Sequence, residues 1–328
     1  MPSKILVTGA SGFIGRWLCS RLQGSGLTVH ALLRQPAEGP WSEAFSVNLG
    51  VDPILAEILN KVDTVFHLAG KAHALAELPG ETADYQQVNV TGTRILLEAA
   101  VAAGVKRFIF FSSVKALADP GEQCVDEGWQ PAPATDIYGR SKYEAEKLVL
   151  ATGRESGMHV CCLRPALVYG PGVKGNLLRM MQAIDTGRFP PVPDTGNRRS
   201  MVHVDDLVQA AMLAAEKPAA NGKTYIVTDG RQYSTREMYV MMAETLGRRV
   251  PAWSVPAWVL RGGGHIGDLI GRIRGRRFSV DSEAVARLLG SACYSSQKIE
   301  QELGYIPARD LGSALPEMVA SYRNHDPG

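Results

Sequence analysis

Three side chains in the middle of the chain are of types that together can move a proton. Tyr138 and Lys142 lie four residues apart in a helix-forming stretch, so they share one face of that helix. A phenol with an ordinary pKa near about 10 is a poor base, but a nearby ammonium favours the phenolate and lowers that pKa. Ser113 precedes Tyr138 and can hydrogen-bond the reacting oxygen. The three residues predict a proton relay for a carbinol or carbonyl group beside a hydride carrier. Tyr and Lys at this spacing alone would equally fit a surface helix.

The start of the chain predicts a site for that hydride carrier. The apolar run 5–7 is typical of a buried parallel strand, and the segment 16–23 is typical of an amphipathic helix. Between them, Gly9 permits a tight turn, Gly12 leaves room for a pyrophosphate, and Gly15 lets the helix pack close to the sheet. The amides at the helix N-terminus would hold the phosphates. This stretch predicts a dinucleotide site, and the alternative is a plain β-α turn.

The residues after the second strand bear on which dinucleotide is bound. A strand is expected over 27–33, and NAD-specific folds carry an acidic residue at its end that binds the ribose 2′-hydroxyl. Here Leu33 is followed by Arg34, which could pair with a 2′-phosphate. We therefore expect NADP in preference to NAD, unless Arg34 is an ordinary exposed loop residue.

Composition narrows the class of protein. The chain has 328 residues, 45% of them hydrophobic, and a formal charge of +2, which gives no case for nucleic acid as a partner. The five cysteines include no CxxC pair and no His/Cys metal spacing, so no metal site is expected. Their odd number and the large core fit a reduced, cytoplasmic protein. Neither a signal peptide nor a membrane-spanning run is expected.

Strands and helices are expected to alternate along the first half of the chain. Strands are predicted at 45–49, 64–68 and 106–112, and helices at 54–60 and 91–103. Ser112 and Ser113 end the last of these strands, and ligands of open α/β sheets bind beyond the carboxyl ends of the strands. His67 is expected to be structural, whereas Lys71 and His73 could line a substrate pocket. The loop 115–136 is long enough to cover a site.

In combination, these motifs resemble those of a known family. They are Thr8-Gly9-Ala10-Ser11-Gly12-Phe13-Ile14-Gly15, His67-Leu68-Ala69-Gly70, Asn89-Val90-Thr91-Gly92-Thr93, Ser112-Ser113, and Tyr138 with Lys142. The chain resembles the extended short-chain dehydrogenase/reductases, and within them the nucleotide-sugar epimerases and reductases, over nearly its whole length. The resemblance implies an α/β fold with a Rossmann-type doubly wound parallel sheet and a smaller, interleaved α/β substrate domain.

The resemblance also implies residue roles. Tyr138 would be the acid/base, Lys142 would also bind the nicotinamide ribose, and Ser113 would hold the substrate hydroxyl. Asn48 and Leu49 fall where the adenine would lie, and Leu163-Arg164-Pro165 matches the strand end that flanks the nicotinamide. The expected cofactor-binding residues are Gly9, Ser11, Gly12, Phe13, Ile14, Gly15, Arg34, Asn48, Leu49, Leu68, Ala69, Gly70, Asn89, Tyr138, Lys142, Arg164 and Pro165.

Substrate recognition is expected mainly from the second half of the chain. Asn176 resembles an asparagine that contacts a diphosphate, and Arg199 takes the place of an arginine that binds the phosphates of a sugar nucleotide. A solvated basic loop is the alternative for Arg199. A helix over 204–216 and a strand over 223–228 would return to the main sheet. The cofactor domain would therefore comprise 1–170 with 200–228, and the substrate domain mainly 171–328. The helices from Thr91 and from Tyr138 resemble those that pair in family homodimers.

The expected reaction is hydride transfer at C4 of a UDP-sugar. Val114-Lys115-Ala116-Leu117 departs from the Val-Tyr-Gly of many epimerases, and this region resembles enzymes of bacterial polysaccharide synthesis. We therefore expect reduction of a UDP-4-keto-6-deoxy-N-acetylhexosamine. The alternatives are a 4-epimerase of UDP-hexoses or UDP-N-acetylhexosamines with retained NAD, and a catalytically silent redox-sensing or scaffold protein.

One apolar, glycine-rich and basic stretch, 253–275, shows no clear period. Arg272, Arg274, Arg276 and Arg277 cluster at its end. These arginines could cap a substrate phosphate, meet an acidic partner or touch a membrane surface, and the sequence does not rank the three.

Overall fold

A seven-stranded parallel sheet forms the centre of the molecule. The computed structural model describes residues 4–71, 81–129, 136–274 and 281–325. The strands of the sheet follow the order β10-β7-β5-β4-β1-β2-β3, so the chain winds outward in both directions from β1. Their bounds are β1 Lys4–Thr8, β2 Thr28–Leu33, β3 Glu43–Ser46, β4 Val62–His67, β5 Arg107–Phe111, β7 His159–Pro165 and β10 Lys223–Val227. The expected Rossmann-type doubly wound fold is confirmed.

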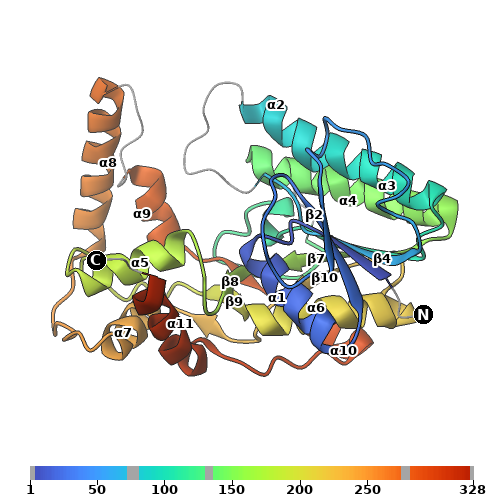
Figure 1. The fold of residues 1–328 in the computed structure, drawn as a ribbon. Helices are drawn as coiled ribbons and strands as arrows, with labels where there is room; N and C mark the ends of the chain where they lie inside the picture. Colours follow the sequence, from blue (N-terminus) through green and yellow to red (C-terminus); the bar gives the residue numbers. More distant parts are fainter. Residues whose placement is uncertain (1–3, 72–80, 130–135, 275–280, 326–328) are drawn as a thin grey trace.

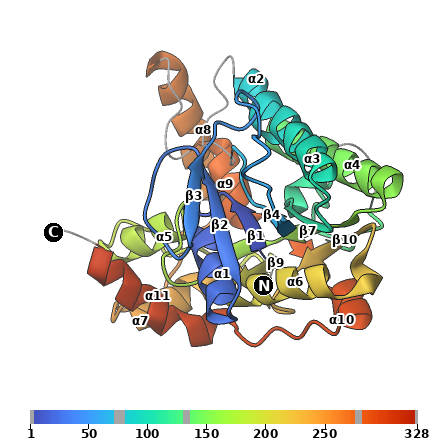
Figure 2. The same ribbon diagram turned by 45° about the vertical axis from the view of Figure 1, so that its right-hand side comes forward.

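Helices cover both faces of this sheet (Figures 1 and 2). On one face α1 (Phe13–Gly24) and α6 (Val204–Glu216) place Leu18, Leu22 and Val208 in one apolar core, together with α10 (Gln297–Leu303). On the other face α3 (Gly92–Ala102) and α4 (Ile137–Ser156) place Leu96 and Val149 in a second core. Because both faces are buried, the central strands are rich in apolar residues, as their near-continuous apolar runs predict.

A second group of elements packs beside the main sheet. A three-stranded sheet has the order β11-β9-β8, from β8 (Leu167–Tyr169), β9 (Arg199–His203) and β11 (Gln232–Tyr233). Its apolar core also takes residues from α5 (Asn176–Asp185), α7 (Thr235–Thr245) and α11 (Leu311–His325). The remaining elements are α2 (Glu81–Tyr85), the π-helix η1 (Gln86–Thr91), the 3-10 helices η2 (Val114–Ala116) and η3 (Pro218–Ala220), the paired strands β6 (Cys124–Val125) and β12 (Cys293–Tyr294), and α8 (Ala257–Arg274) and α9 (Ser282–Leu289).

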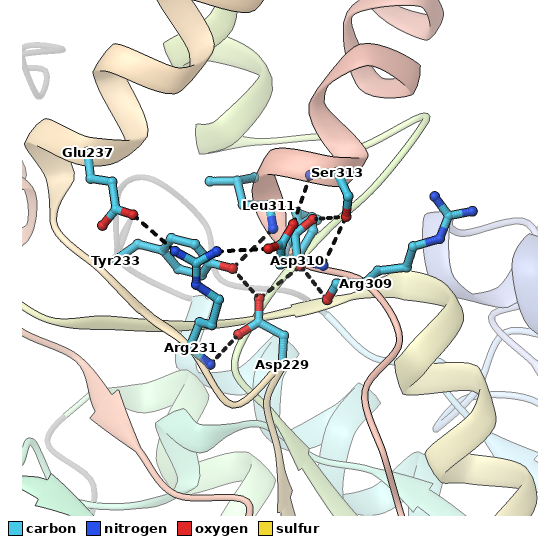
Figure 3. Close-up of polar contacts among 9 residues, drawn as sticks. Asp229, Arg231, Tyr233, Glu237, Arg309, Asp310, Leu311 and Ser313 are labelled. Carbon is cyan, nitrogen blue, oxygen red and sulfur yellow. Dashed lines mark hydrogen bonds and ion pairs between the residues drawn. The ribbon is translucent and has the colours of Figure 1, made fainter.

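A buried polar cluster joins the two groups of elements (Figure 3). Asp229, just after β10, accepts hydrogen bonds at Oδ2 from the phenols of Tyr169 (2.8 Å) and Tyr233 (2.9 Å). Its Oδ1 accepts from the backbone N–H of Arg231. The backbone N–H of Leu311, at the start of α11, donates to the Tyr233 phenol at 3.0 Å. Both rings are fully buried, so this cluster fixes β8, β11 and α11 around the end of β10, an edge strand of the main sheet.

Two sequence predictions of local structure are wrong. The segment 54–60 forms turns rather than a helix, although Ile58 and Leu59 are buried as a helix would bury them. Seven residues give too few hydrogen bonds to offset helix nucleation, and the left-handed Lys61 (φ 61°) turns the chain directly into β4. The third strand also lies earlier than expected, at Glu43–Ser46, where it pairs in parallel with β2.

Cys124 and Cys293 form a disulfide between β6 and β12. This pair departs from the expectation of a reduced chain. The two cysteines are 169 residues apart, and nothing in their local sequence indicated a partner. Cys19, Cys161 and Cys162 are buried free thiols, as the apolar context of the last two predicted.

Candidate active site

The glycine turn has the close packing that its sequence predicts. Gly9 has a left-handed φ of 68°, and a Cβ there would lie 2.8 Å from the backbone N of Ala69. A Cβ on Gly15 would lie 2.3 Å from the carbonyl oxygen of Gly9, so α1 can approach β1 only because this residue is glycine. Gly12 caps α1 without any side-chain hydrogen bond to the first-turn amides. The turn therefore fits a dinucleotide pyrophosphate, with backbone N–H groups at a helix N-terminus as donors.

Asn89 ties the exit of β4 to the first turn of α4. Its Oδ1 accepts from the backbone N–H of Lys71 at 2.7 Å, and its Nδ2 donates to the Ser141 hydroxyl at 2.9 Å. Ser141 in turn donates to the carbonyl oxygen of Tyr138. A Cβ on Gly70 would lie 2.9 Å from the Asn89 Oδ1. Both ends of the Asn89 amide are thus bonded to the protein itself, and the residue positions the segment that carries Tyr138.

His67 is structural, as predicted. The Thr93 hydroxyl donates to the carbonyl oxygen of Asn89 and therefore accepts from Nε2 of His67, whose Nδ1 accepts from the Thr8 hydroxyl. Complete burial and the nearby Lys142 lower the pKa of His67 to about 3, so the ring is neutral. The Thr8 oxygen also accepts from the N–H of Ala69. This chain of bonds holds the ends of β1 and β4 together beside the glycine turn.

Tyr138, Ser113 and Lys142 come together at the carboxyl end of β5. Tyr138 lies in the first turn of α4, whose N-terminus is capped by Asp136, and a hydrogen bond links its phenol to Ser113. Ser113 lies two residues after the end of β5 and caps η2. Lys142, one turn along α4, is 4% exposed and donates from Nζ to the carbonyl oxygen of Phe111 at 2.9 Å. The structure therefore brings together the three residues predicted to form the proton relay.

The sequence predicted a lowered pKa for the Tyr138 phenol, and this direction is wrong. Burial raises the pKa of the phenol to about 12, the Ser113 hydrogen bond opposes this, and Asp136 raises the pKa further. The net shift is upward in spite of the nearby Lys142, whose ammonium donates to the Phe111 carbonyl. At neutral pH the phenol in this structure is protonated, which suits a proton donor.

Burial lowers the pKa of Lys142 to about 8, against the attraction of Glu146. Glu146 itself forms a buried two-bond ion pair with Arg164, at 2.8 and 2.6 Å. The guanidinium of Arg164, a predicted cofactor-binding residue, is therefore already engaged by Glu146.

A cavity of about 380 Å³ opens between the start of α1 and the segment 171–182. Ser11 and Phe13, both predicted cofactor residues, line it together with Arg16, Trp17 and Lys174. Sequence reasoning missed these last three. Arg16 follows the final glycine of the turn directly, and this is the signal that could have identified it.

Most of the remaining predicted cofactor residues lie at or just after the ends of strands of the main sheet. Arg34 is exposed directly after β2, next to the strand that carries the glycine turn. Leu49 is buried against Gly92, and Asn48 is exposed with its N–H bonded to Asp52. Ile14 lies in α1, Leu68 follows β4, and Pro165 ends β7.

The predicted substrate residues are more scattered. Lys71 pairs with Asp84 at 2.8 Å, and His73 lies outside the described residues. Asn176 is exposed at the start of α5. Arg199 donates from Nη1 to the carbonyl oxygens of Arg287 and Gly290, so it fastens β9 to the end of α9. Its predicted phosphate contact would need the remaining guanidinium donors. Within the described ranges, no group of His, Cys, Asp and Glu side chains could hold a metal ion.

The comparisons with known proteins agree with this geometry. The family model of the NAD dependent epimerase/dehydratase family matches residues 5–228, a range that includes the glycine turn, Ser113, Tyr138 and Lys142. The chain belongs to this family. It is an NAD-dependent enzyme of the epimerase/dehydratase type, and the family resemblance stated above is confirmed.

Individual relatives act on different substrates. The chain is 32% identical to the UDP-glucose 4-epimerase of Vibrio cholerae, over 98% of this chain and 96% of that one. It is 29% identical to a ketoreductase of Stigmatella aurantiaca that acts on a farnesylated dihydroquinoline oxide, over 92% of this chain and 91% of that one. The structure of MoeE5 in complex with UDP-glucuronic acid and NAD superimposes with a TM-score of 0.77 at 27% identity, over 98% and 99% of the two chains.

Proposed function

We propose that this family member reduces the 4-keto group of a UDP-linked sugar, most specifically a UDP-4-keto-6-deoxy-N-acetylhexosamine. The observation that carries the proposal is the protonated phenol of Tyr138, hydrogen-bonded to Ser113 at the carboxyl end of β5. A carbonyl oxygen placed between these two hydroxyls would accept a hydrogen bond from each. The UDP group is inferred from the nucleotide sugars that similar proteins bind or convert.

Each residue of the cluster has a separate role in the proposal. Bound at the glycine turn, the nicotinamide cofactor would supply the hydride. Tyr138 gives its proton to the developing alkoxide oxygen, and Ser113 holds that oxygen in place. Lys142 lies one helical turn from Tyr138 and supplies positive charge that stabilises the phenolate left behind. With a pKa of about 8, this lysine is mostly protonated at neutral pH.

The choice of a reductase over an epimerase rests on Arg34. A reductase must exchange its spent cofactor in every cycle, and NADPH is the usual biosynthetic reductant. No carboxylate ends β2, where NAD-specific folds place one, and the exposed Arg34 follows directly. A charge-assisted bond from Arg34 to a 2′-phosphate would contribute roughly 1.5–3 kcal/mol.

A 4-epimerase with retained NAD is the second candidate, and the similarity to the Vibrio cholerae enzyme favours it. An epimerase would use the same three residues, first to oxidise C4 and then to reduce it from the other face. Its cofactor would stay bound and end unchanged. The two candidates therefore differ in whether a cofactor is consumed.

The deciding experiment measures cofactor consumption. Given a UDP-4-keto-6-deoxy-N-acetylhexosamine, the purified enzyme should oxidise NADPH stoichiometrically and should carry little nicotinamide as purified. Arg34→Ala should lower the preference for NADPH over NADH by about 10- to 100-fold. Interconversion of UDP-N-acetylglucosamine and UDP-N-acetylgalactosamine without added cofactor would instead establish the epimerase. An unchanged cofactor ratio in Arg34→Ala would remove Arg34 from the site.

A further inference from the structure

Helix α8 presents most of its large apolar side chains to solvent rather than to the protein. Of the eleven large apolar side chains exposed among the described residues, six lie between Trp253 and Ile273. Trp258 is 73% exposed and Ile273 is 77% exposed, near the two ends of the helix. An ordinary surface helix turns such residues inward. This helix therefore has an unusual outer face.

Glycines occupy the inner side of α8 and explain this orientation. Gly264 and Gly267 are buried, and a Cβ on Gly264 would lie 2.9 Å from the Cα of Ser282 at the start of α9. The carboxylate of Asp268 accepts from the N–H of Ser282 and fixes the same contact. The close approach to α9 thus depends on small residues, and it leaves the bulky residues on the outside. In Figures 1 and 2, α8 projects from the rest of the fold beside α9.

The exposed apolar residues form one continuous face. At 100° per residue, Trp258, Leu269, Ile273, Ile266 and Val259 fall within an arc of about 100°. The 18 residues of the helix make this face about 27 Å long. Trp253, just before the helix, is 63% exposed as well. Tryptophan is a residue type that favours the boundary between apolar and polar phases.

Arginines border this apolar face on both sides. Arg261 and Arg272 lie about 40–60° beyond one edge of the arc, and Arg274 lies about 60° beyond the other. All three are exposed. The only acidic residue in α8 is Asp268, which is bonded to α9. The helix therefore combines an apolar face with positively charged edges.

We propose that α8 docks the enzyme on the surface of an anionic lipid bilayer, with its apolar face in the headgroup region. A peripheral amphipathic helix needs an apolar face rich in Trp, Leu or Ile, and Lys or Arg at the polar border. The arginines complement acidic headgroups, each contributing on the order of a fivefold gain in affinity. Within the described residues no helix is long and apolar enough to cross a membrane, so the contact is peripheral.

A second copy of the chain is a poorer occupant of this face. Antiparallel two-fold packing centred on Ile266 would bring Arg261 of each copy near the other copy's Arg272. The face itself carries no acidic side chain to compensate this repulsion. Anionic headgroups satisfy the apolar and the charged parts of the surface together.

Vesicle sedimentation with the full-length enzyme tests the proposal. The wild-type protein should bind vesicles of phosphatidylcholine with phosphatidylglycerol, and should bind pure phosphatidylcholine at least tenfold more weakly. Ile266→Glu combined with Ile273→Glu, and separately Arg261→Glu combined with Arg272→Glu, should each reduce binding at least tenfold. Val51→Glu is the matched control, because Val51 is an equally exposed apolar residue elsewhere (62%, as Ile266), and it should bind like wild type.

Two results would overturn the proposal. One is the absence of binding to anionic vesicles, or binding that the α8 variants leave unchanged. The other is a wild-type dimer in sedimentation velocity that Ile266→Glu with Ile273→Glu converts to a monomer, because the face would then be a contact between copies. Unchanged circular dichroism and cofactor binding of the variants show that they are folded.

Discussion

Two buried tyrosine clusters in this molecule use the same side chain in opposite ways. Tyr169 and Tyr233 both donate to Asp229, and Tyr233 also accepts from the backbone N–H of Leu311, so the protein itself holds both hydroxyls. Tyr138 is half-buried and hydrogen-bonds to Ser113, beside the buried Lys142. The first arrangement consumes hydrogen-bonding capacity to fix the fold. The second places a protonated phenol beside a serine hydroxyl and a buried ammonium, and these neighbours distinguish the proposed reactive phenol from the structural ones.

The effect of charge also differs between the two clusters. Burial and the Asp229 carboxylate both raise the pKa values of Tyr169 and Tyr233, so these phenols stay protonated and neutral. At Tyr138 burial raises the pKa, while the neighbouring cation is itself held at a pKa of about 8. The site therefore holds a buried ammonium, that of Lys142, whose charged form the folded protein disfavours. Such perturbed groups concentrate where chemistry is done.

The largest expected effect is on catalysis. Tyr138→Phe keeps the ring and removes only the transferable proton, so turnover should fall about 10²–10⁴-fold. Cofactor affinity and the free energy of unfolding should stay close to the wild-type values. Steady-state kinetics with cofactor titration measures this, and near-normal turnover would reject Tyr138 as the acid.

A smaller effect concerns the pH dependence of stability. Because the folded-state pKa of Lys142 (about 8) lies below its ordinary value of 10.5, the unfolded chain binds more protons between these values. This group therefore makes the protein more stable as pH rises through that window. Urea unfolding should show that, between pH 7.5 and 9.5, the free energy of unfolding rises by about 2 kcal/mol more in the wild type than in Lys142→Met. Equal gains would show that Lys142 is not a disfavoured buried cation.

The smallest effect is expected at the structural cluster. Tyr233→Phe removes one donor to Asp229 and the acceptor of the Leu311 N–H, and should cost about 1–2 kcal/mol of unfolding free energy. Turnover should change less than threefold, because the cluster touches none of the three proposed catalytic residues. Denaturant unfolding together with kinetics tests this. A large loss of activity without a loss of stability would place Tyr233 in the reaction instead.

The parts of the fold that the sequence predicted well depend on local patterns. The glycines at 9, 12 and 15 specify the turn by sterics alone, and the apolar pattern of 204–216 specifies α6 with the bounds observed. Tyr138 and Lys142 needed only helical spacing to be placed on one face. These features depend on neighbours within a few residues, which the sequence displays directly.

The features that were missed depend on partners far along the chain. Helix α8 was not recognised because its glycines face the protein and its large residues face outward, which removes the usual inward apolar stripe. Arg199 bonds to carbonyl oxygens 88 and 91 residues away, and no local pattern indicates such acceptors. The sign of the Tyr138 pKa shift also depended on burial, which spacing does not reveal.

The most direct test of the central claim compares two matched Tyr→Phe variants in single-turnover hydride transfer and urea unfolding. Tyr138→Phe should slow hydride transfer to the UDP-4-keto sugar by at least 10²-fold and leave unfolding unchanged. Tyr233→Phe should lower the unfolding free energy and leave hydride transfer unchanged. The account is contradicted if Tyr138→Phe transfers hydride at the wild-type rate, or if both variants lose activity in proportion to their loss of stability.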